Sequence, residues 1–432
     1  DWLIKNIKRI TKKSLSLEAF FLFRIMKSSF FYCAFSTIFF MELNADDIKK
    51  SFLPQFREEY KLDEILDDGS YDIDFDEIKT DVIINGQIGS GAFINIYYLS
   101  NIPYSIQKQS KFLSVYNNTE DRRVTIKRKN KKNLKENLGK IVLTIPKNIN
   151  INFKKCQGDI SIENISGSIN FNEHVGAVNL NRLNGDLDLN SSSGNVVIDS
   201  SDLFSNIYLK SHSLILQSVL GKSNITILNG NIFINSFVGS LNLFSTSGLI
   251  ELNEIQGKSI NCNISSATVM GKNITSDLVI NGNDGGIQLK KIIGRCNVKT
   301  TGGDILIKGS TGSVTCTTSG GNITLEEISG SSDVESYFGN IYLEKIYDSS
   351  IENTFHNITT VEGNIDLEIQ KDLSLSLSAG IHFNRSTQDI TSQIPLNFEL
   401  KDNRIVGEAF INEGLLPIVL FSKYGYISIK DY

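Results

Sequence analysis

The sequence predicts an all-β protein, a parallel β-solenoid whose two-strand coils each take about 18 residues. Three features favour this fold. A short phrase of one glycine, one polar residue and alternating apolar residues recurs between residues 158 and 367. Small turn-forming residues precede many copies, as in the run from Ser191 to Gly194. The first copies begin nine residues apart, at Gly158, Gly167, Gly176, Gly185 and Gly194.

Nine residues supply one strand and one corner, so two copies of the phrase complete one coil. Successive side chains of a strand face opposite ways, so Ile160 and Ile162 share the buried face. Glycine suits the corner because it tolerates positive φ and lets neighbouring backbones approach closely. Either Asp or Asn follows the glycine, as at Asp159 and Asn195, and we expect both to cap the local backbone of the corner. A calcium-binding repeat would favour Asp alone.

The pattern divides the chain into four parts. Residues 1–45 read as a targeting segment, residues 46–157 as an N-terminal helix followed by a β cap, residues 158–367 as the repeat array, and residues 368–432 as a C-terminal β cap. The ends of a solenoid expose unpaired backbone and open core, so both ends need such covers.

The targeting segment allows two interpretations. A charged stretch after Met26, an apolar run of about a dozen residues and a possible cleavage after Ala45 indicate a secretory signal, which predicts a secreted or extracellular protein. Residues 1–27 are also basic and contain only two acids, Asp1 and Glu18, which is typical of a mitochondrial presequence. The apolar run is too short to span a bilayer comfortably, so no transmembrane span is expected in the mature chain.

The segment before the repeats has a mixed pattern. Ile48, Phe52, Phe56 and Tyr60 lie four residues apart, which predicts a short amphipathic helix over residues 46–66. The acidic stretch that follows lacks the turn glycine of a calcium loop, so we expect a solvated loop there. From Lys79 onward, short alternating runs predict the strands of an irregular β cap.

Composition argues against several classes of function. The formal net charge of −5 gives no overall basic field, so nucleic acid is not an expected partner. The five cysteines form no CxxC pair and the four histidines are isolated in sequence, so we predict no metal, no cofactor and no disulfide framework. The outward positions of the repeats carry mostly Ser, Thr, Asn and isolated charges, and the sequence shows no phosphate loop or dinucleotide fingerprint, so no catalytic residue is assigned.

Two regions are weak candidates for contact with a partner. The first is the dense basic cluster before the repeats, which could meet an anionic polymer or lipid, although a solvated hairpin loop explains it as well. The second is the insertion at residues 347–362, which interrupts the repeat and which a simple corner bulge also explains. The candidate residues are Arg122, Arg123, Lys127, Arg128, Lys129, Lys131, Lys132 and His356.

The chain resembles a family of adhesin-like domains of unknown function, common in bacteria and with an uncharacterised animal homologue. The resemblance covers about residues 80–432 and rests on the strand Val142–Pro146, the repeated Ser/Thr-x-Gly-Asp/Asn-Ile-x-Ile phrases, and the closing stretch Ser422–Ile429. It implies a parallel β-solenoid with an adhesive or scaffolding role, and it supplies no catalytic residues. The weakened turns near Ser205 and Asn273 depart from the family pattern.

These observations favour a non-enzymatic, adhesin-like or scaffold protein. Its elongated sheets would present a flat surface of Ser, Thr and Asn to a protein or a glycan. A carbohydrate-active β-helix enzyme is the alternative from another class, and it would require carboxylates of adjacent coils to meet at a cleft. Self-assembly into a structural filament is the third possibility.

Overall fold

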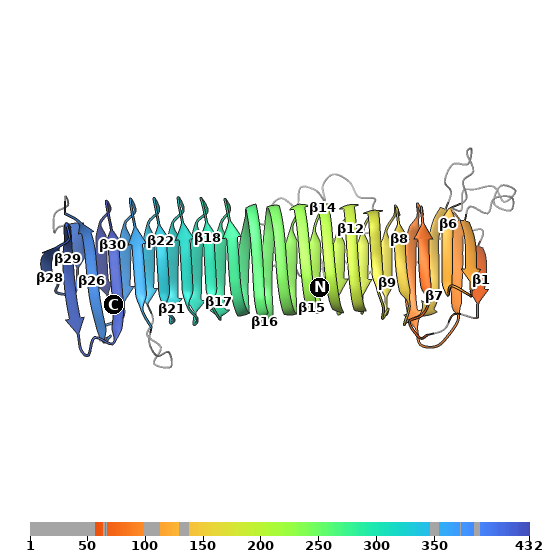
Figure 1. Ribbon diagram of the computed structural model, residues 1–432, viewed down its shortest axis with the longest axis horizontal. Coiled ribbons are helices and arrows are strands. Elements are labelled where there is room, and N and C mark those ends of the chain that lie inside the picture. Colours follow the sequence, from red (N-terminus) through yellow and green to blue (C-terminus); the bar gives the residue numbers. More distant parts are fainter. Residues whose placement is uncertain are drawn as a thin grey trace, which may run out of the picture.

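The computed structural model describes residues 57–63, 65, 67–98, 113–128, 138–345, 354–371, 373–383 and 389–432. These residues form a long rod of stacked strands with no α-helix (Figure 1). The predicted targeting segment therefore lies outside the described residues. The all-β solenoid architecture is confirmed.

Two files of mostly parallel strands, which we call row A and row B, make up the rod. Row A comprises, in spatial order, β6 (Arg123–Arg128), β2 (Asp72–Asp76), β8 (Asn150–Lys154), β10 (Ile169–Val175), β12 (Asn184–Ser193), β14 (Asp202–Ser211), parts of β15 (Leu214–Asn229) and β16 (Ile232–Gly282), β18 (Cys296–Thr300), β20 (Val314–Thr318), β22 (Ser332–Ser336), β24 (His356–Thr360), β30 (Leu416–Ser422) and β26 (Leu375–His382).

Row B faces row A across the hydrophobic core, and along the chain a strand of one row is followed by a strand of the other. It comprises β7 (Leu138–Pro146), β3 (Asp81–Gln87), β9 (Ile160–Glu163), β11 (Val178–Asn181), β13 (Val196–Asp199), the remaining parts of β15 and β16, β17 (Ile287–Ile293), β19 (Ile305–Ser310), β21 (Ile323–Ile328), β23 (Ile341–Lys345), β25 (Ile365–Ile369), β31 (Ile427–Asp431) and β27 (Ile390–Ser392). Because β15 and β16 run through the corners, they join both rows into one sheet of 31 described strands.

Parallel pairing in register builds the core. In row B, Ile160 pairs with Val178, Val178 with Val196, and Val196 with Leu214, and all four side chains are buried. Each of these inward side chains therefore stacks on an apolar side chain of the neighbouring coil. Burial of this kind contributes about 25 cal/mol per Å² of apolar surface, which makes the stacked core the main stabilising feature.

The corner residues connect one coil to the next. The side-chain oxygen of Asp304 accepts from the backbone N–H of Asn322, and that of Asn322 accepts from the backbone N–H of Asn340, over 2.8 and 3.0 Å. Asp and Asn serve equally, as their alternation in sequence indicates. The prediction that they cap their own corner is wrong, because the acceptor reaches the neighbouring coil.

The predicted helix over residues 46–66 is wrong where it can be checked. Residues 57–62 form strand β1 (Arg57–Leu62), which pairs antiparallel with β4 (Ala92–Tyr98), and the rest of the predicted helix lies mainly outside the described residues. Tyr60 and Leu62 pack against the core, while Glu59 and Lys61 face solvent. Pairing with an open sheet edge thus overrides a weak helical period.

Strands of reversed direction close the ends. At the N-terminal end, β4 pairs antiparallel with β7, and β5 (Leu113–Asn118) pairs antiparallel with β6. At the C-terminal end, β29 (Arg404–Ile411) pairs antiparallel with β26, and β28 (Asn397–Lys401) pairs antiparallel with β29. Both flanking parts also add parallel strands to the rows, so the solenoid pairing continues beyond residues 158–367. The four-part division stays a prediction.

Close stacking at the corners leads to a test with two glycines. A Cβ at Gly239, where φ is +148°, would lie 1.7 Å from the carbonyl oxygen of Gly221, whereas a Cβ at Gly286 would have no atom within 4 Å. We expect Gly239→Ala to lower the free energy of unfolding by about 2–4 kcal/mol, because two coils must separate. Gly286→Ala should change it by less than about 0.5 kcal/mol. Urea unfolding followed by circular dichroism measures both, and equal effects would contradict close stacking.

Candidate functional site

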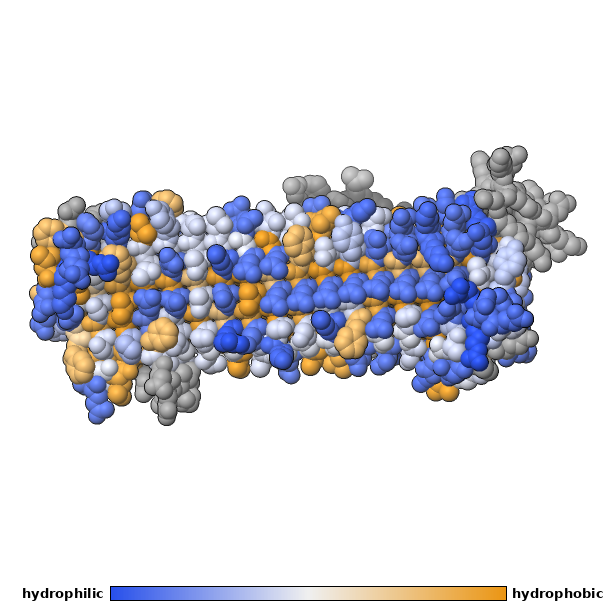
Figure 2. Space-filling view, viewed as in Figure 1, coloured by the Kyte–Doolittle hydropathy of each residue, from blue (hydrophilic) through white to orange (hydrophobic). Residues whose placement is uncertain are grey.

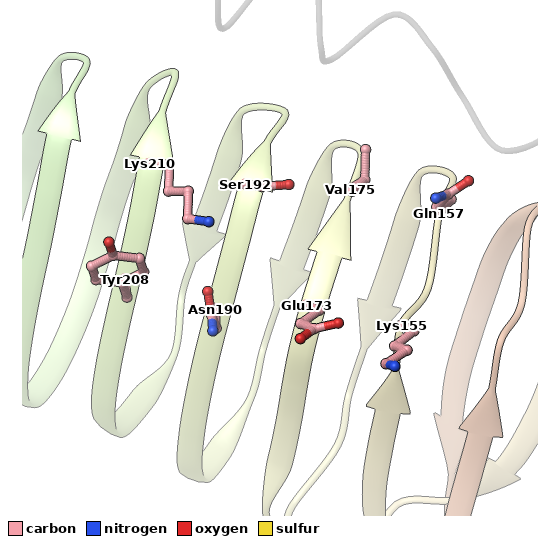
Figure 3. A pocket seen from close by; sticks show the side chains of 8 residues that line it. All are labelled: Lys155, Gln157, Glu173, Val175, Asn190, Ser192, Tyr208 and Lys210. Carbon is pink, nitrogen blue, oxygen red and sulfur yellow. The ribbon is translucent and has the colours of Figure 1, made fainter.

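A groove of about 480 Å³ lies on the outward face of row A, across β8 to β14. Figure 3 shows two files of side chains that cross four coils. In one file Glu173 lies between Lys155 and Asn190, and Tyr208 closes the line. The lining residues are Lys155, Gln157, Glu173, Val175, Asn190, Ser192, Tyr208 and Lys210.

A change in the path of the chain accounts for the groove. Lys155 and Glu173 both adopt left-handed backbone, with φ of 52° and 59°, and the pairing of β10 with β12 shifts register on either side of His174. The next pair, β12 and β14, runs in unbroken register. In row A the strands up to β10 therefore bulge at this position, whereas β12 and β14 run straight. The groove lies where the bulged strands meet the straight ones.

A buried histidine lies beneath the step. The His174 side chain is 0% exposed, its ring meets that of Phe171 edge-on at 5.7 Å, and neither ring nitrogen has a hydrogen-bond partner among the described residues. Phe171 continues a stack through Phe153 to Phe75, with centroid distances of 4.7 and 4.6 Å. Desolvation lowers the pKa of His174, so the ring is neutral near pH 7.

An extended polar surface runs along row A from the groove. Each Asn of this ladder except Asn263 donates its amide N–H to the side-chain oxygen of a neighbouring coil over 2.8–3.2 Å, as Asn224 does to Asn206. Figure 2 shows the ladder as a straight hydrophilic band on this face. Its bonded runs are Asp74–Asn152–Asn170, Asp188–Asn206–Asn224–Asn242–Asn261 and Asn263–Asn281.

The ladder leaves bonding capacity free at every step. A primary amide offers two donor hydrogens and two acceptor lone pairs. The bond to the preceding coil uses one donor, and the bond from the next coil uses one acceptor. Asn206, Asn224 and Asn242 are exposed, so the remaining donor and acceptor face solvent. Parallel strands place these groups about 4.8 Å apart.

The structure brings the predicted basic cluster together with the acidic stretch. Strand β6 pairs with β2, and Arg123 donates to Asp72 over 3.1 Å while Lys127 donates to Asp76 over 2.6 Å. Arg122 forms an ion pair with Asp68 at 3.4 Å. The expected solvated acidic loop is therefore partly strand β2. Sequence reading missed this pairing because the partners lie about fifty residues apart.

Hydrogen bonding shifts the pKa of both cations. Asp72 accepts from Arg123 and raises the pKa of that guanidinium, and Asp76 raises the pKa of Lys127 in the same way. Both groups stay charged over the physiological range, but their charge is matched by a carboxylate. Arg128 ends strand β6, and Lys129, Lys131 and Lys132 lie outside the described residues.

The second contact candidate, His356, lies in the core and not on the surface. Its side chain is 1% exposed, and Nδ1 lies 3.0 Å from the Ser332 hydroxyl in the neighbouring strand. The alternation of strand β24 turns His356 inward together with Ile358. Residues 347–353 of the insertion that contains His356 lie outside the described residues.

The described cysteines have the character of core residues. Cys156, Cys262, Cys296 and Cys316 are buried and free, and desolvation raises the pKa of the Cys156 thiol to about 11 and that of Cys262 to about 12. Such thiols are poor nucleophiles near neutral pH. In the described part of the chain, no group of three His, Cys, Asp or Glu residues could hold a metal ion. The same part contains no helix with the length and apolar character needed to cross a bilayer.

The unpartnered His174 predicts acid sensitivity. An unfolded histidine binds a proton near pH 6.5, and burial lowers the pKa of His174 in the folded state. Stability is therefore lost as the pH falls through about 6.5 toward the folded-state pKa. We expect His174→Leu to reduce the fall in melting temperature between pH 7.5 and 5.5, because it removes the titrating group. His212→Asn, at an exposed position with φ of 83°, is the control, and an unchanged pH profile in His174→Leu would contradict the assignment.

The paired charges of β2 and β6 predict a gain of anion binding on substitution. We expect Asp72→Asn with Asp76→Asn to elute from heparin at higher salt than the wild type, because Lys127 loses its carboxylate partner and Arg123 keeps only Asp74, at 3.6 Å. Asp186→Asn with Asp202→Asn makes the same change in net charge at exposed positions of the rod. Equal elution of the two double variants would show that net charge alone controls heparin binding.

Comparison with known proteins supports the resemblance inferred from sequence. Residues 235–404 match the Toastrack DUF4097 family model, which confirms the similarity over that range. A candidate cell adhesion protein from Clostridium sporogenes is 8% identical, with a TM-score of 0.16, and the match covers 87% of this chain and 100% of that one. A candidate adhesin from Bacteroides fragilis is 14% identical, with a TM-score of 0.19, over 87% of this chain and 96% of that one. No curated protein matches the chain. The rod is thus similar, over 170 residues of its C-terminal half, to a domain family defined by its sequence.

Proposed function

We propose that this protein is a non-enzymatic, adhesin-like binding protein and that its ligand is a glycan held along row A. The ladder of bonded asparagines is the observation that carries the proposal. It offers free amide donors and acceptors at the regular strand spacing, on a face that runs along much of the rod. A polymer of hydroxyl-bearing units suits such a surface because each hydroxyl can both donate and accept.

The groove adds contacts that the flat ladder lacks. Tyr208 supplies an aromatic ring with a polar tip, and such rings favour one face of a sugar. Asn190 and Gln157 add amides, and Lys155 and Lys210 add cations for an acidic sugar unit. The groove spans β8 to β14, where the ladder also runs, so one chain of sugar units could engage both.

The distribution of carboxylates favours binding over hydrolysis. Glycoside hydrolysis requires two carboxyl groups that flank the reacting bond. Among the eight residues that line the groove, only Glu173 carries a carboxylate. The ladder carboxylates Asp74 and Asp188 each accept a hydrogen bond from a neighbouring asparagine. A carbohydrate-active enzyme is therefore the weaker alternative.

The secretory interpretation of the targeting pattern favours a role outside the cell. The family model matches residues 235–404, where the sequence phrases resemble those of adhesin-like domains. A secreted or extracellular location is part of this proposal, and the mitochondrial alternative predicts a different set of ligands. Sequencing the N-terminus of the mature protein, together with its cellular location, distinguishes the two addresses.

A glycan array with the full chain, followed by calorimetry on the hits, tests the proposal. We expect Tyr208→Ala to weaken binding about fivefold or more, because truncation of a contact aromatic commonly costs above 1 kcal/mol. Tyr426→Ala, which removes an exposed ring directly before strand β31 of row B, should bind as the wild type does.

Three results would count against this function. Loss of affinity in both tyrosine variants would place the ligand elsewhere. Release of shortened sugars from any hit would identify an enzyme. An array without hits, combined with specific capture of a protein ligand, would favour the protein-binding form of the adhesin role.

A further inference from the structure

At the C-terminal end of the rod, row A extends further than row B. Row B ends at the three-residue strand β27, whereas row A continues past β26 through β29 to β28. Leu400 pairs with Ile405, and Ile405 pairs with Ile381 of the core, so these three side chains share one face. Leu400 is nevertheless 62% exposed, and Phe398 beside it is 43% exposed.

Exposed apolar side chains concentrate at this end. Of the twenty large apolar residues exposed in the described part of the chain, nine lie within residues 383–432. Exposed apolar patches on soluble proteins mark interaction surfaces. The nine residues are Phe383, Phe398, Leu400, Phe410, Leu415, Val419, Tyr424, Tyr426 and Tyr432.

Strand β28 also has an open edge. It pairs with β29 on one side, all five of its residues are exposed, and no described strand pairs with its other side. Asp402 and Asn403, with φ of 48° and 59°, form the two-residue turn to β29, so Lys401 and Arg404 are the closing hydrogen-bonded pair. Hydrogen-bonded pairs alternate along antiparallel strands, so the N–H and C=O groups of Phe398 and Leu400 point away from β29.

The sequence of this edge is complementary to itself. If β28 pairs antiparallel with β28 of a second copy about Leu400, then Leu400 lies opposite the partner's Leu400 on the two-fold axis. Glu399 then lies opposite the partner's Lys401, and Lys401 opposite the partner's Glu399. Each outward N–H and C=O of Leu400 meets its counterpart in this register.

We propose that β28 is a docking edge for a second copy of this chain, which joins two rods end to end in a two-fold symmetric dimer. The neighbouring register, centred on Glu399, would place like charges opposite each other, which is destabilising. The register centred on Leu400 forms two opposite-charge pairs and brings the two Leu400 side chains into contact. Isologous pairing closes after two copies, so the assembly stops at a dimer.

Reversing the charges on strand β28 tests whether this edge forms the dimer. Glu399→Lys and Lys401→Glu each place like charges opposite each other in a homodimer. In a mixed dimer of the two variants, both cross-strand pairs become attractive. Sedimentation velocity of the full chain between ~1 and ~100 µM measures the dimer fraction, and at least a tenfold weaker homodimer is expected for each variant.

The expected pattern is a wild-type dimer, two weakened variants, and recovery of the dimer when the variants are mixed. Lys258→Glu, an exposed change on β16, is the control and should dimerise as the wild type does. Because Lys401 forms ion pairs with Glu399 of its own strand at 3.2 Å and with Glu408 at 2.8 Å, melting curves must show that each variant stays folded. A wild type that remains monomeric at the highest concentration overturns the proposal, and so does a dimer that neither variant weakens or that mixing fails to restore.

Discussion

The exact superposition of one coil on the next is the constraint on which this structure depends. Each strand hydrogen-bonds to the strand one coil away, so backbones of the same shape must stack at the strand spacing. At the corners the stack is tightest, and the backbone of Gly239 lies directly on that of Gly221 with no room for a Cβ. Only glycine fits at these corners because it has no Cβ, and this steric requirement explains why glycine recurs at a regular spacing in the sequence.

Stacking also decides which side chains can repeat. Like contacts like from coil to coil, so inward positions repeat apolar residues, and outward positions repeat a group that both donates and accepts. Asparagine meets that condition, whereas a carboxylate only accepts. Asp74 and Asp188 accordingly occupy the first position of their runs, where each accepts from the asparagine that follows. Repeated like charges would repel, which explains why the ladder is made of amides.

The sequence is sufficient to predict the structure of the repeated coils, but not the contacts that depart from the repeat. Local alternation and the glycine spacing were sufficient to predict the stacked strands and their buried faces, because the same pattern recurs in every coil of the repeat array. The strand over residues 57–62 was missed because its partner is an edge elsewhere in the chain, which a local helical period cannot reveal. The charge pairing of Arg123 with Asp72 and the groove at Glu173 were missed for a similar reason, since each depends on how two separate strands meet. The bulge at the groove leaves a slight signal in the sequence, because the inward residues Phe171 and His174 are three residues apart where strict alternation gives two.

A rod that grows by adding coils must treat its ends and its sides differently. Along the sides, the backbone of each strand pairs with the strands of the neighbouring coils, so mainly side chains are left to meet a ligand. At the ends the backbone itself is available, and only reversed strands, charge or a partner can satisfy it. At the N-terminal end the last strands are β1 and β5, and the hairpin partner of β5, strand β6, forms ion pairs with β2. At the C-terminal end the last strand is β28, which is exposed and carries Glu399 and Lys401 on either side of Leu400. The proposed ligand binding along row A and the proposed contact between copies at β28 would use different chemistry on separate surfaces. A dimer joined at β28 would therefore carry two copies of the asparagine ladder on one assembly, and two weak sites for one polymer bind more tightly together than either does alone.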